Sequence, residues 1–360
     1  MIKGKNILLG VSGGIAAYKV LELCSRLKKE GANLKIIMTK DACEFVSPLS
    51  FETMGKCLVY SDMFEGHHDR VYHIDLPKWA DVFLVAPLSA NTLAKMAYGL
   101  ADNMLTASLL ACDKNIIVAP TMNTNMLNNK ATQENLKKIR ERGVHIINPN
   151  SGLLACDTTG DGRMEEPVNI VRYLDYYFTK KDLIGKKIVV SAGPTVEPID
   201  YVRYITNKSS GKMGYNIAIE AFKRGAYVKL ISGPVSPMEV NGIDKINIRT
   251  NQELKDAIEK EFDDCDALIM SAAPTDYKVR DVSDKKIKKD GNNLNLDLIE
   301  NIDILKHFGD KKDKQILIGF AAETDDLIKN AKIKLESKNA DYIIANDLKK
   351  KGAGFDVDTN

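Results

Sequence analysis

Residues 185–214 read GKKIVVSAGPTVEPIDYVRYITNKSSGKMG, and they decide how the chain is organised. The apolar run 188–190 leads through a loop rich in glycine and proline into an amphipathic segment, which is the pattern of a βαβ unit. The first residues of the chain repeat this pattern, with an apolar run at 7–9. In both places a glycine, Gly31 or Gly225, ends the helical segment before a second strand-like run. We therefore expect two nucleotide-fold-like α/β domains in tandem.

The composition is that of a globular protein. A length of 360 residues suits two domains of ordinary size. The 51 Lys and Arg nearly balance the 49 Asp and Glu, so the net charge favours neither nucleic acid nor a membrane as partner. No apolar run approaches the ~20 residues of a membrane helix, and the start leads directly into a strand, so we expect a cytoplasmic protein. Six scattered cysteines without a C-x-x-C pair predict neither a disulfide framework nor a zinc site.

The first predicted domain, residues 1–178, alternates strand-like and helical patterns. Such alternation predicts a parallel sheet with helices on both faces, a three-layer fold of the flavodoxin-like or Rossmann-like kind. Ligands of these sheets bind at the carboxyl ends of the strands, where the polar loops of this chain fall. The strand-like runs lie at 5–9, 33–38, 81–86, 115–119 and 144–147.

The loop after the first run, GVSGGIAAYK, places backbone N–H groups at a helix N-terminus, which suits a phosphate. Its spacing does not match G-x-G-x-x-G, and the chain lacks G-x-x-x-x-G-K-[ST], so a dinucleotide fingerprint and a P-loop are both absent. A mononucleotide such as FMN is the candidate ligand. The same residue types also serve as helix caps and in tight turns, so that interpretation stays open for each of them. The candidate contacts are Ser12, Gly13, Gly14, Thr39, Ser89, Asn91 and Thr92.

Three further segments of the first half carry reactive residue types. His73 lies in VYHIDLPKWADVFLVAP just ahead of a predicted short helix, although a lone histidine is more often structural. Asn123 lies in APTMNTNM, where its amide is able to meet a carboxylate. NSGLLACDTTGDGRMEEP is a polar, glycine-rich loop that holds Cys156 and Arg163. Free cysteine is usually a buried apolar residue, so its place in a polar loop favours a reactive role.

Taken together and in this order, these segments resemble the flavin-dependent phosphopantothenoylcysteine decarboxylases over the whole first half. The resemblance implies FMN, which takes up electrons from the substrate thiol so that carbon dioxide can leave and then returns them, without a nicotinamide. It implies that His73 is the active-site base, that Asn123 holds the substrate carboxylate and that Cys156 donates a proton; we also expect Arg163 to contact the substrate. The sequence departs from the family at Asp157, where glycine is common, and an acid there should raise the pKa of the Cys156 thiol.

A polar connector at 179–185 precedes the second predicted domain, residues 186–360. Strand-like and helical patterns alternate again, which predicts another Rossmann-like domain. The segment 293–301 has a period of two and is predicted as an added strand. The other strand-like runs lie at 187–191, 227–231, 267–271, 315–321 and 341–345, with helices notably at 250–262 and 325–338.

Two constellations in this domain suit phosphate chemistry. TNKSSGKMG places Asn207 and the serines that follow it at a helix start. AAPTDYKVRDVSDKKIKK places Asp276 after a strand and Lys286 in a basic loop, which indicates either a polyphosphate site or a solvated surface. Lys334 and Lys338 share one face of a predicted helix and allow the same two interpretations.

The second half resembles phosphopantothenate-cysteine ligase, in SAGPTVEPID, TNKSSGKMG, AAPTDY, KIKK, GFAAET and AND. The resemblance implies that phosphopantothenate attacks CTP to give an acyl-cytidylate, from which the amine of cysteine displaces CMP, with Mg²⁺ accompanying the triphosphate. CTP in place of ATP follows only from the likeness to bacterial members. The resemblance also implies that Asn207 binds the acyl-nucleotide and the substrate and that Lys286 takes part in the reaction. The implied nucleotide contacts are Ser271, Ala272, Asp276, Lys286, Ile302, Asp303, Ile304, Leu305, Phe320, Lys334 and Lys338.

The resemblances together predict a bifunctional enzyme of coenzyme A synthesis that assembles as a trimer-based dodecamer with paired ligase halves. Two alternatives remain: a decarboxylase with an incomplete ligase half, and a flavin-binding regulatory protein without catalysis. The first arises because the sequence ends soon after Asn346 and Asp347, where relatives continue, which would leave a sheet edge uncovered. The second is disfavoured because His73, Asn123 and Cys156 are all present.

Overall fold

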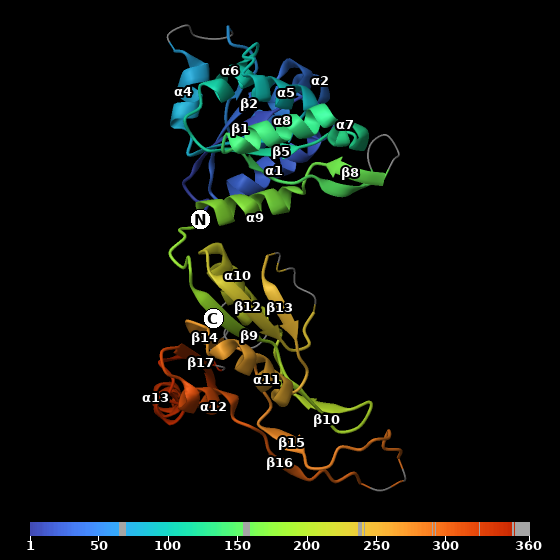
Figure 1. Cartoon of the computed structure of the whole chain (residues 1–360), viewed down its shortest axis with the longest axis vertical. Coiled ribbons are helices and arrows are strands. Elements are labelled where there is room, and N and C mark those ends of the chain that lie inside the picture. The colour runs from blue at the N-terminus through green and yellow to red at the C-terminus, as the bar shows by residue number, and fades with distance from the viewer. Residues whose placement is uncertain are drawn as a thin grey trace. The chain divides into compact units, whose positions relative to one another are not determined.

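The computed structural model describes residues 1–64, 70–153, 159–236, 240, 242–289, 291, 293–323, 325–347 and 349. The chain divides into two compact units, Met1–Thr179 and Lys180–Asn360. Each unit has its own six-stranded parallel sheet with helices packed on both faces, which confirms the predicted α/β class (Figure 1).

The sheet of the first unit runs in the order β3-β2-β1-β4-β5-β6. This is the doubly wound Rossmann order, in which the direction of winding reverses between β1 and β4. Loops that leave these two central strands diverge to opposite sides and open a crevice at the carboxyl ends. The strands are β1 (Asn6–Val11), β2 (Asn33–Met38), β3 (Val59–Tyr60), β4 (Val82–Leu88), β5 (Ile116–Pro120) and β6 (His145–Ile146).

The helices of this unit pack through apolar stripes at helical spacing. In α1 the buried positions Val20, Leu23 and Leu27 recur every three or four residues, and Arg26, Lys28 and Lys29 in the last turn complement the helix dipole. The helices are α1 (Ala17–Lys29), α2 (Lys40–Phe45), α3 (Pro48–Gly55), α4 (Tyr72–Trp79), α5 (Ala90–Tyr98), α6 (Met104–Leu110), α7 (Thr124–Asn128), α8 (Lys130–Glu141) and α9 (Pro167–Phe178).

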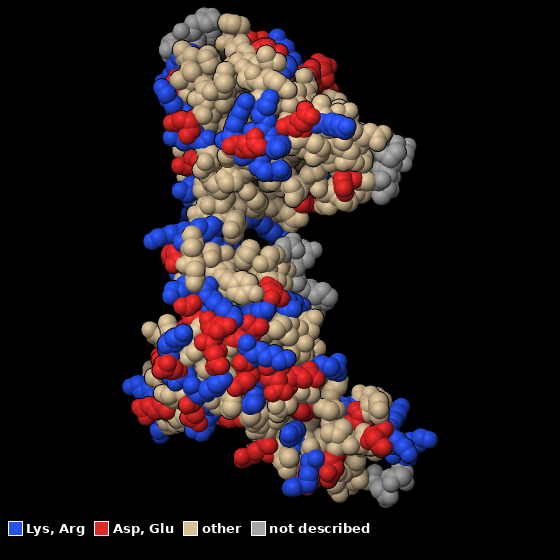
Figure 2. Space-filling view, viewed as in Figure 1, with Lys and Arg blue, Asp and Glu red and all other residues tan. Residues whose placement is uncertain are grey.

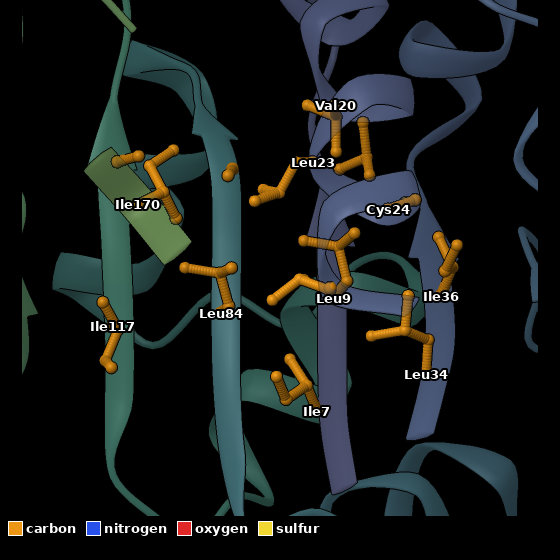
Figure 3. Packing of buried hydrophobic residues seen from close by; sticks show 14 of the residues in the cluster. Ile7, Leu9, Val20, Leu23, Cys24, Leu34, Ile36, Leu84, Ile117 and Ile170 are labelled. Carbon is orange, nitrogen blue, oxygen red and sulfur yellow. The ribbon is translucent and has the colours of Figure 1, made fainter. Parts of the chain in front are cut away.

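The sheet separates two apolar cores, because successive side chains of a strand point to opposite faces. Leu9 of β1 packs in the same cluster as Leu23 and Ile170, on the face that α1 and α9 cover (Figure 3). Leu8, the preceding residue, packs with Phe83 and other residues in the cluster on the opposite face. All of these side chains are fully buried, so the central strands of the sheet are fixed from both sides.

The glycine-rich segment predicted as a loop contains an antiparallel hairpin, β7 (Asn150–Leu153) and β8 (Thr159–Arg163). The hairpin is anchored at the loop after β5: the Met122 N–H donates to the Gly162 carbonyl over 3.0 Å, and the Thr124 hydroxyl donates to the Asp161 carbonyl over 2.8 Å. The glycines lack the β-branched and apolar side chains by which strands are recognised, so the sequence does not predict these two strands.

The second unit repeats the topology of the first, with the sheet order β13-β12-β9-β14-β17-β18 and a switch point between β9 and β14. Its own cores lie on the two faces of this sheet, one with Val189, Leu268 and Phe308 and the other with Val190 and Tyr215. The sheet strands are β9 (Lys187–Ala192), β12 (Tyr227–Ser232), β13 (Asp244–Asn247), β14 (Ala267–Met270), β17 (Ile316–Glu323) and β18 (Tyr342–Asp347).

Two antiparallel hairpins extend from this sheet (Figure 1). They are formed by β10 (Val196–Pro198) with β11 (Tyr204–Thr206), and by β15 (Tyr277–Val279) with β16 (Leu298–Glu300). The predicted strand 293–301 is thus realised only at its end. The helices of the unit are α10 (Lys212–Lys223), α11 (Asn251–Phe262), α12 (Ile304–Lys311) and α13 (Leu327–Ser337).

The surface agrees with the balanced composition. On the face shown, Lys and Arg alternate with Asp and Glu over the second unit (Figure 2). Lys229, for example, lies 3.5 Å from a Glu261 oxygen, and Lys187 lies 2.9 Å from the other oxygen of the same carboxylate. None of the helices in the described ranges has the length and apolarity needed to cross a membrane.

Candidate active sites at the strand ends

Ser12 joins the carboxyl ends of β1 and β4, the two strands at the switch point of the first unit. Its hydroxyl donates to the Pro87 carbonyl over 2.7 Å and accepts from the Ser89 N–H over 2.8 Å. Its own N–H donates to the Pro87 carbonyl over 3.3 Å. Ser12 is fully buried, so the structure uses this predicted flavin contact to fix the two loops at the crevice.

The turn between β1 and α1 forms an open cradle of backbone. No side chain of the described residues caps the N-terminus of α1. The N–H groups of Ala17 and Lys19 donate instead to the Gly14 and Ala16 carbonyls, each over 3.0 Å, so a tight turn extends the helix and its positive dipole end toward Gly14. At Gly13 a Cβ atom would come within 2.4 Å of the Asp41 Cβ, so only glycine fits there. At Gly14 a Cβ would meet nothing within 4 Å, which leaves open space above the backbone. This cradle fits the phosphate of a mononucleotide.

The remaining predicted flavin contacts lie at the starts of the neighbouring helices. Thr39 caps α2, accepting from the Ala42 N–H over 3.2 Å, and Ser89 caps α5, accepting from the Thr92 N–H over 3.3 Å. Asn91 is exposed, whereas Thr92 is 4% exposed. The capping interpretation is therefore confirmed for Thr39 and Ser89, and the contact of these residues with a flavin stays a prediction.

His73 and Asn123 are both half-buried, but they are placed by different elements. The sequence pattern predicts His73 just ahead of a helix, whereas in the structure His73 lies in the first turn of α4. Asn123 caps α7, with its Oδ1 accepting from the Asn125 N–H over 2.8 Å. That bond fixes the orientation of the Asn123 amide at the end of β5.

Arg163 ends β8, and its guanidinium lies 3.7 Å from the Glu166 carboxylate. The same carboxylate receives a hydrogen bond of 2.7 Å from Lys19 on α1, so Glu166 links the hairpin to the first helix. Cys156, the predicted proton donor, and Asp157 lie outside the described residues.

The second unit contains a cavity of about 1140 Å³ at the carboxyl ends of its strands. The loop before α10 and the segments after β14 and β16 line this cavity. Residues of β17 and of the C-terminal part of α13 line it as well. The predicted residues that line it are Asn207, Ser271, Ala272, Asp276, Ile302, Asp303, Ile304, Leu305, Phe320, Lys334 and Lys338.

The loop before α10 has the features of an anion site. Gly211, in the left-handed conformation at φ 75°, precedes the helix, and no described side chain caps it. The Asn207 amide nitrogen donates to the Pro274 carbonyl over 2.8 Å and so ties this loop to the segment after β14. This bond fixes the orientation of the Asn207 amide group at the wall of the cavity.

Lys334 lies in the last turn of α13 and Lys338 caps its C-terminus, and both line the cavity. Lys334 donates to the Phe320 carbonyl over 2.8 Å, and Lys338 pairs with Asp303, the N-cap of α12. Burial raises the pKa of the Asp303 carboxyl, but hydrogen bonds from Lys338 and from the Lys306 N–H outweigh it, so the pKa lies below its ordinary value. A polyphosphate in the cavity would compete with Asp303 for Lys338.

Lys286 is the exception among the predicted nucleotide contacts. It is exposed and does not belong to the described residues that line the cavity. Its neighbour Ile287 is held by Asp200 and Arg203: the Ile287 N–H donates to Asp200 over 3.1 Å, and Arg203 donates to the Ile287 carbonyl over 3.0 Å. These bonds hold the basic segment against the β10–β11 turn, so the structure does not bring Lys286 to the nucleotide site.

The cavity also contains acidic residues that sequence reasoning did not select, Glu220 and Glu300. Asp276 and Asp303 line the same cavity, so four carboxyl groups lie around it. No group of three His, Cys, Asp or Glu within the described ranges is arranged to hold a metal ion by itself.

The fold and these sites define a class: a tandem α/β protein with a mononucleotide cradle in one unit and a larger phosphate-suited cavity in the other. The family model described as Flavoprotein matches residues 1–178, and the model described as DNA/pantothenate metabolism flavoprotein C-terminal domain matches residues 183–360. A relative from Bacillus subtilis, the coenzyme A biosynthesis bifunctional protein CoaBC, is 46% identical over 365 residues, covering 100% of this chain and 90% of its own length.

The chain belongs to the family of bifunctional coenzyme A biosynthesis proteins. It is thus an enzyme of coenzyme A biosynthesis with a decarboxylase and a ligase activity. Among solved structures, a PPC decarboxylase mutant complexed with pantothenoylaminoethenethiol is 37% identical, covers 49% of this chain and 99% of its own, and has a TM-score of 0.46. The C-terminal domain of a CoaBC protein is 41% identical, covers 47% of this chain and 80% of its own, and has a TM-score of 0.43.

Proposed function

We propose that residues 1–178 decarboxylate phosphopantothenoylcysteine with FMN and that residues 186–360 make this substrate from phosphopantothenate, cysteine and CTP. The observation that carries the proposal is the cavity of the second unit, which gathers, from distant parts of the chain, eleven contacts that the ligase resemblance implies. The α1 cradle supports FMN in the first unit because the positive end of the helix dipole and the open space at Gly14 suit a phosphate.

In the decarboxylase half, FMN would supply a reversible two-electron acceptor for the substrate thiol. His73 would accept the thiol proton, and the Asn123 amide, oriented by its bond to the Asn125 N–H, would hold the substrate carboxylate. Arg163 would provide positive charge for the same substrate. Cys156 would donate a proton to the carbon skeleton after carbon dioxide has left.

The role of Cys156 is tested by Cys156→Ser, with Cys112→Ser as the control because Cys112 is half-buried in the same unit and has no proposed role. We expect Cys156→Ser to retain FMN and to accumulate an oxidised, decarboxylated product that mass spectrometry distinguishes from phosphopantetheine. Wild-type turnover by Cys156→Ser would remove this thiol from the reaction.

In the ligase half, the phosphopantothenate carboxylate would attack the α-phosphorus of CTP and release pyrophosphate, and the cysteine amine would then displace CMP. The N-terminus of α10, Lys334 and Lys338 would stabilise the phosphates, and Asn207 would bind the acyl-nucleotide. Mg²⁺ would accompany the triphosphate, with carboxylates of the cavity as its protein ligands. Lys286 would act in the reaction only after a rearrangement that brings its segment to the cavity.

The nucleotide site is tested by Lys338→Gln, with Lys306→Gln as the control, since Lys306 is an exposed lysine on α12 that pairs with Asp310. Removing one cationic contact to the triphosphate should raise the KM for CTP about tenfold, the size of a charge-assisted hydrogen bond. Parallel assays with ATP establish the nucleotide. An unchanged KM for CTP in Lys338→Gln would contradict this placement of the triphosphate.

We further propose that the chain forms a trimer-based dodecamer with paired ligase halves and works in the cytoplasm. Light scattering of the FMN-loaded chain tests the assembly: a mass of twelve chains is expected, and a monomer would contradict it.

A further inference from the structure

A closed ring of hydrogen bonds lies beneath the cavity of the second unit. The Thr195 hydroxyl donates to the Asn251 Oδ1 over 2.6 Å, the Asn251 Nδ2 donates to the Thr275 carbonyl over 2.9 Å, and the Thr275 N–H donates back to the Thr195 hydroxyl over 3.0 Å. Thr195 and Asn251 are fully buried, and Thr275 is 3% exposed. The ring ties β10 and the start of α11 to the segment after β14, which carries Asp276.

Glu197, on β10, connects this ring to the opposite wall. Its Oε1 accepts from the Asn251 N–H over 2.8 Å and from the Asn301 Nδ2 over 3.1 Å. Asn301 lines the cavity, accepts from the Ile302 N–H with its own side chain over 3.0 Å, and donates its backbone N–H to the Asp276 carbonyl over 2.8 Å. One carboxylate oxygen therefore joins Asn301 to Asn251, and through the Asn251 bond to Thr275 it is linked to the other segment of the cavity wall.

The environment of Glu197 is unusual for a carboxylate. The residue is 6% exposed, and among the described residues no Lys, Arg or His forms an ion pair with it. Burying a carboxylate without a cationic partner is costly unless hydrogen bonds compensate. A buried network of satisfied groups holds its members in one arrangement. The backbone groups of Thr275 and the side chains of Thr195 and Asn251 are bonded here, whereas the buried Thr275 hydroxyl has no partner among the described residues.

We propose that Glu197 is a positioning residue that holds the segments 274–276 and 300–302 in the spacing that the ligand of the cavity requires. The identity of this ligand as CTP rests on the proposed function, but the positioning does not. Without the Glu197 oxygen, the Asn301 amide loses its buried partner. The bond of the Asn301 N–H to the Asp276 carbonyl and the pairing of Tyr277 with Glu300 remain, so the segment that carries Ile302 and Asp303 stays attached beside Asp276 but is held less rigidly.

The test uses the full FMN-loaded chain and the variants Glu197→Ala and Glu197→Gln. Gln315→Ala is the matched control, because Gln315 is also buried, donates to the Phe262 carbonyl over 3.2 Å and lies away from the cavity. Glutamine retains an acceptor oxygen, so Glu197→Gln should keep the hydrogen bond to the Asn301 amide that Glu197→Ala removes. A variant that is merely less stable contains less active enzyme, which lowers kcat without changing KM.

In Glu197→Ala we expect a KM for CTP raised about tenfold and a KM for cysteine within twofold of the wild type, with Glu197→Gln within threefold for both. Equal KM values for CTP in Glu197→Ala and Gln315→Ala would overturn the proposal. An equal increase of the KM for CTP in Glu197→Ala and Glu197→Gln would also overturn the proposal, since the acceptor oxygen would then not be what matters.

Hydrogen–deuterium exchange without nucleotide separates this proposal from the function. Peptides that cover 274–277 and 300–303 should exchange at least fivefold faster in Glu197→Ala than in wild type or Gln315→Ala. Unchanged exchange would overturn the positioning role even in an active ligase. If wild type does not bind CTP while the exchange result holds, the proposed function fails and the positioning role stands.

Discussion

At the scale of single residues, burial determines the chemistry of three cysteines. It raises the pKa of the Cys24 thiol to about 12, and those of Cys57 and Cys265 to about 11 each. A thiol whose pKa lies three units above the pH is deprotonated in about one molecule in a thousand, and only the thiolate is an effective nucleophile. Cys24 and Cys265 are core residues and Cys57 packs half-buried against the core, so we expect none of the three to react as a nucleophile.

We accordingly expect limiting iodoacetamide at pH 8 to leave Cys24, Cys57 and Cys265 unmodified in the native chain. Peptide mass spectrometry measures the modification, and labelling in urea is the control that each peptide can be detected. Rapid native labelling of Cys265 would show that its surroundings are more open than the structure has them.

The lowered pKa of Asp303 has a consequence for stability. A carboxyl whose folded pKa is depressed contributes stability above its unfolded pKa of about 3.9, and this contribution is lost as the pH falls through the folded value. Asp303→Asn should therefore be less stable than wild type at pH 7, and the difference should shrink below about pH 4. Urea unfolding of both proteins across this range measures the difference. A constant difference would mean that the pair with Lys338 contributes no pH-dependent stability.

At the scale of elements, α6 offers a clear test of a helix cap. The Asn103 side chain accepts from the Thr106 N–H over 3.0 Å, and the Thr106 hydroxyl accepts from the Asn103 N–H over 3.2 Å, which is a reciprocal capping box. Asn103→Ala should lower the free energy of unfolding of the first unit by about 1 kcal/mol. Urea denaturation followed by flavin fluorescence measures it, and a change below about 0.3 kcal/mol would show that water replaces the cap.

The central strands could be predicted from the sequence because each is a short apolar run between loop signals. The hairpins could not. The β7–β8 pair is rich in glycine, and of the segment predicted as a strand at 293–301 only Leu298–Glu300 pairs, against Tyr277–Val279. Pairing of such short antiparallel strands depends on what lies beside them in the fold, which local pattern does not contain.

The same limit applies to the sites. Asp276 was predictable because the loop after a parallel strand lies at the carboxyl edge of the sheet. Phe320, within β17, and Lys338, at the end of α13, followed from the resemblance to the ligase. Lys286 was assigned to that edge from its motif, but the bond between Ile287 and Asp200, 87 residues apart in the chain, holds its segment elsewhere. Glu197 was missed for a related reason, since its partners Asn251 and Asn301 are 54 and 104 residues distant.

At the scale of the whole molecule, two units with separate cores should unfold separately. Calorimetry of the full chain should show two transitions, because each unit has its own sheet and its own apolar clusters. Removing FMN should lower only the first unit's transition temperature, and adding CTP with Mg²⁺ should raise only the second's, since a ligand stabilises the fold that binds it. A single transition that responds to both ligands would show that the units unfold together.

The central claim is that the two units act in succession on one substrate. Its most direct test is mass spectrometry of the products after the FMN-loaded chain is incubated with phosphopantothenate, cysteine, CTP and Mg²⁺. The account predicts phosphopantetheine and CMP in equal amounts, and in Cys156→Ser it predicts the oxidised, decarboxylated product in place of phosphopantetheine. Recovery of unchanged phosphopantothenate, together with conversion of added phosphopantothenoylcysteine, would contradict the ligase half of the account.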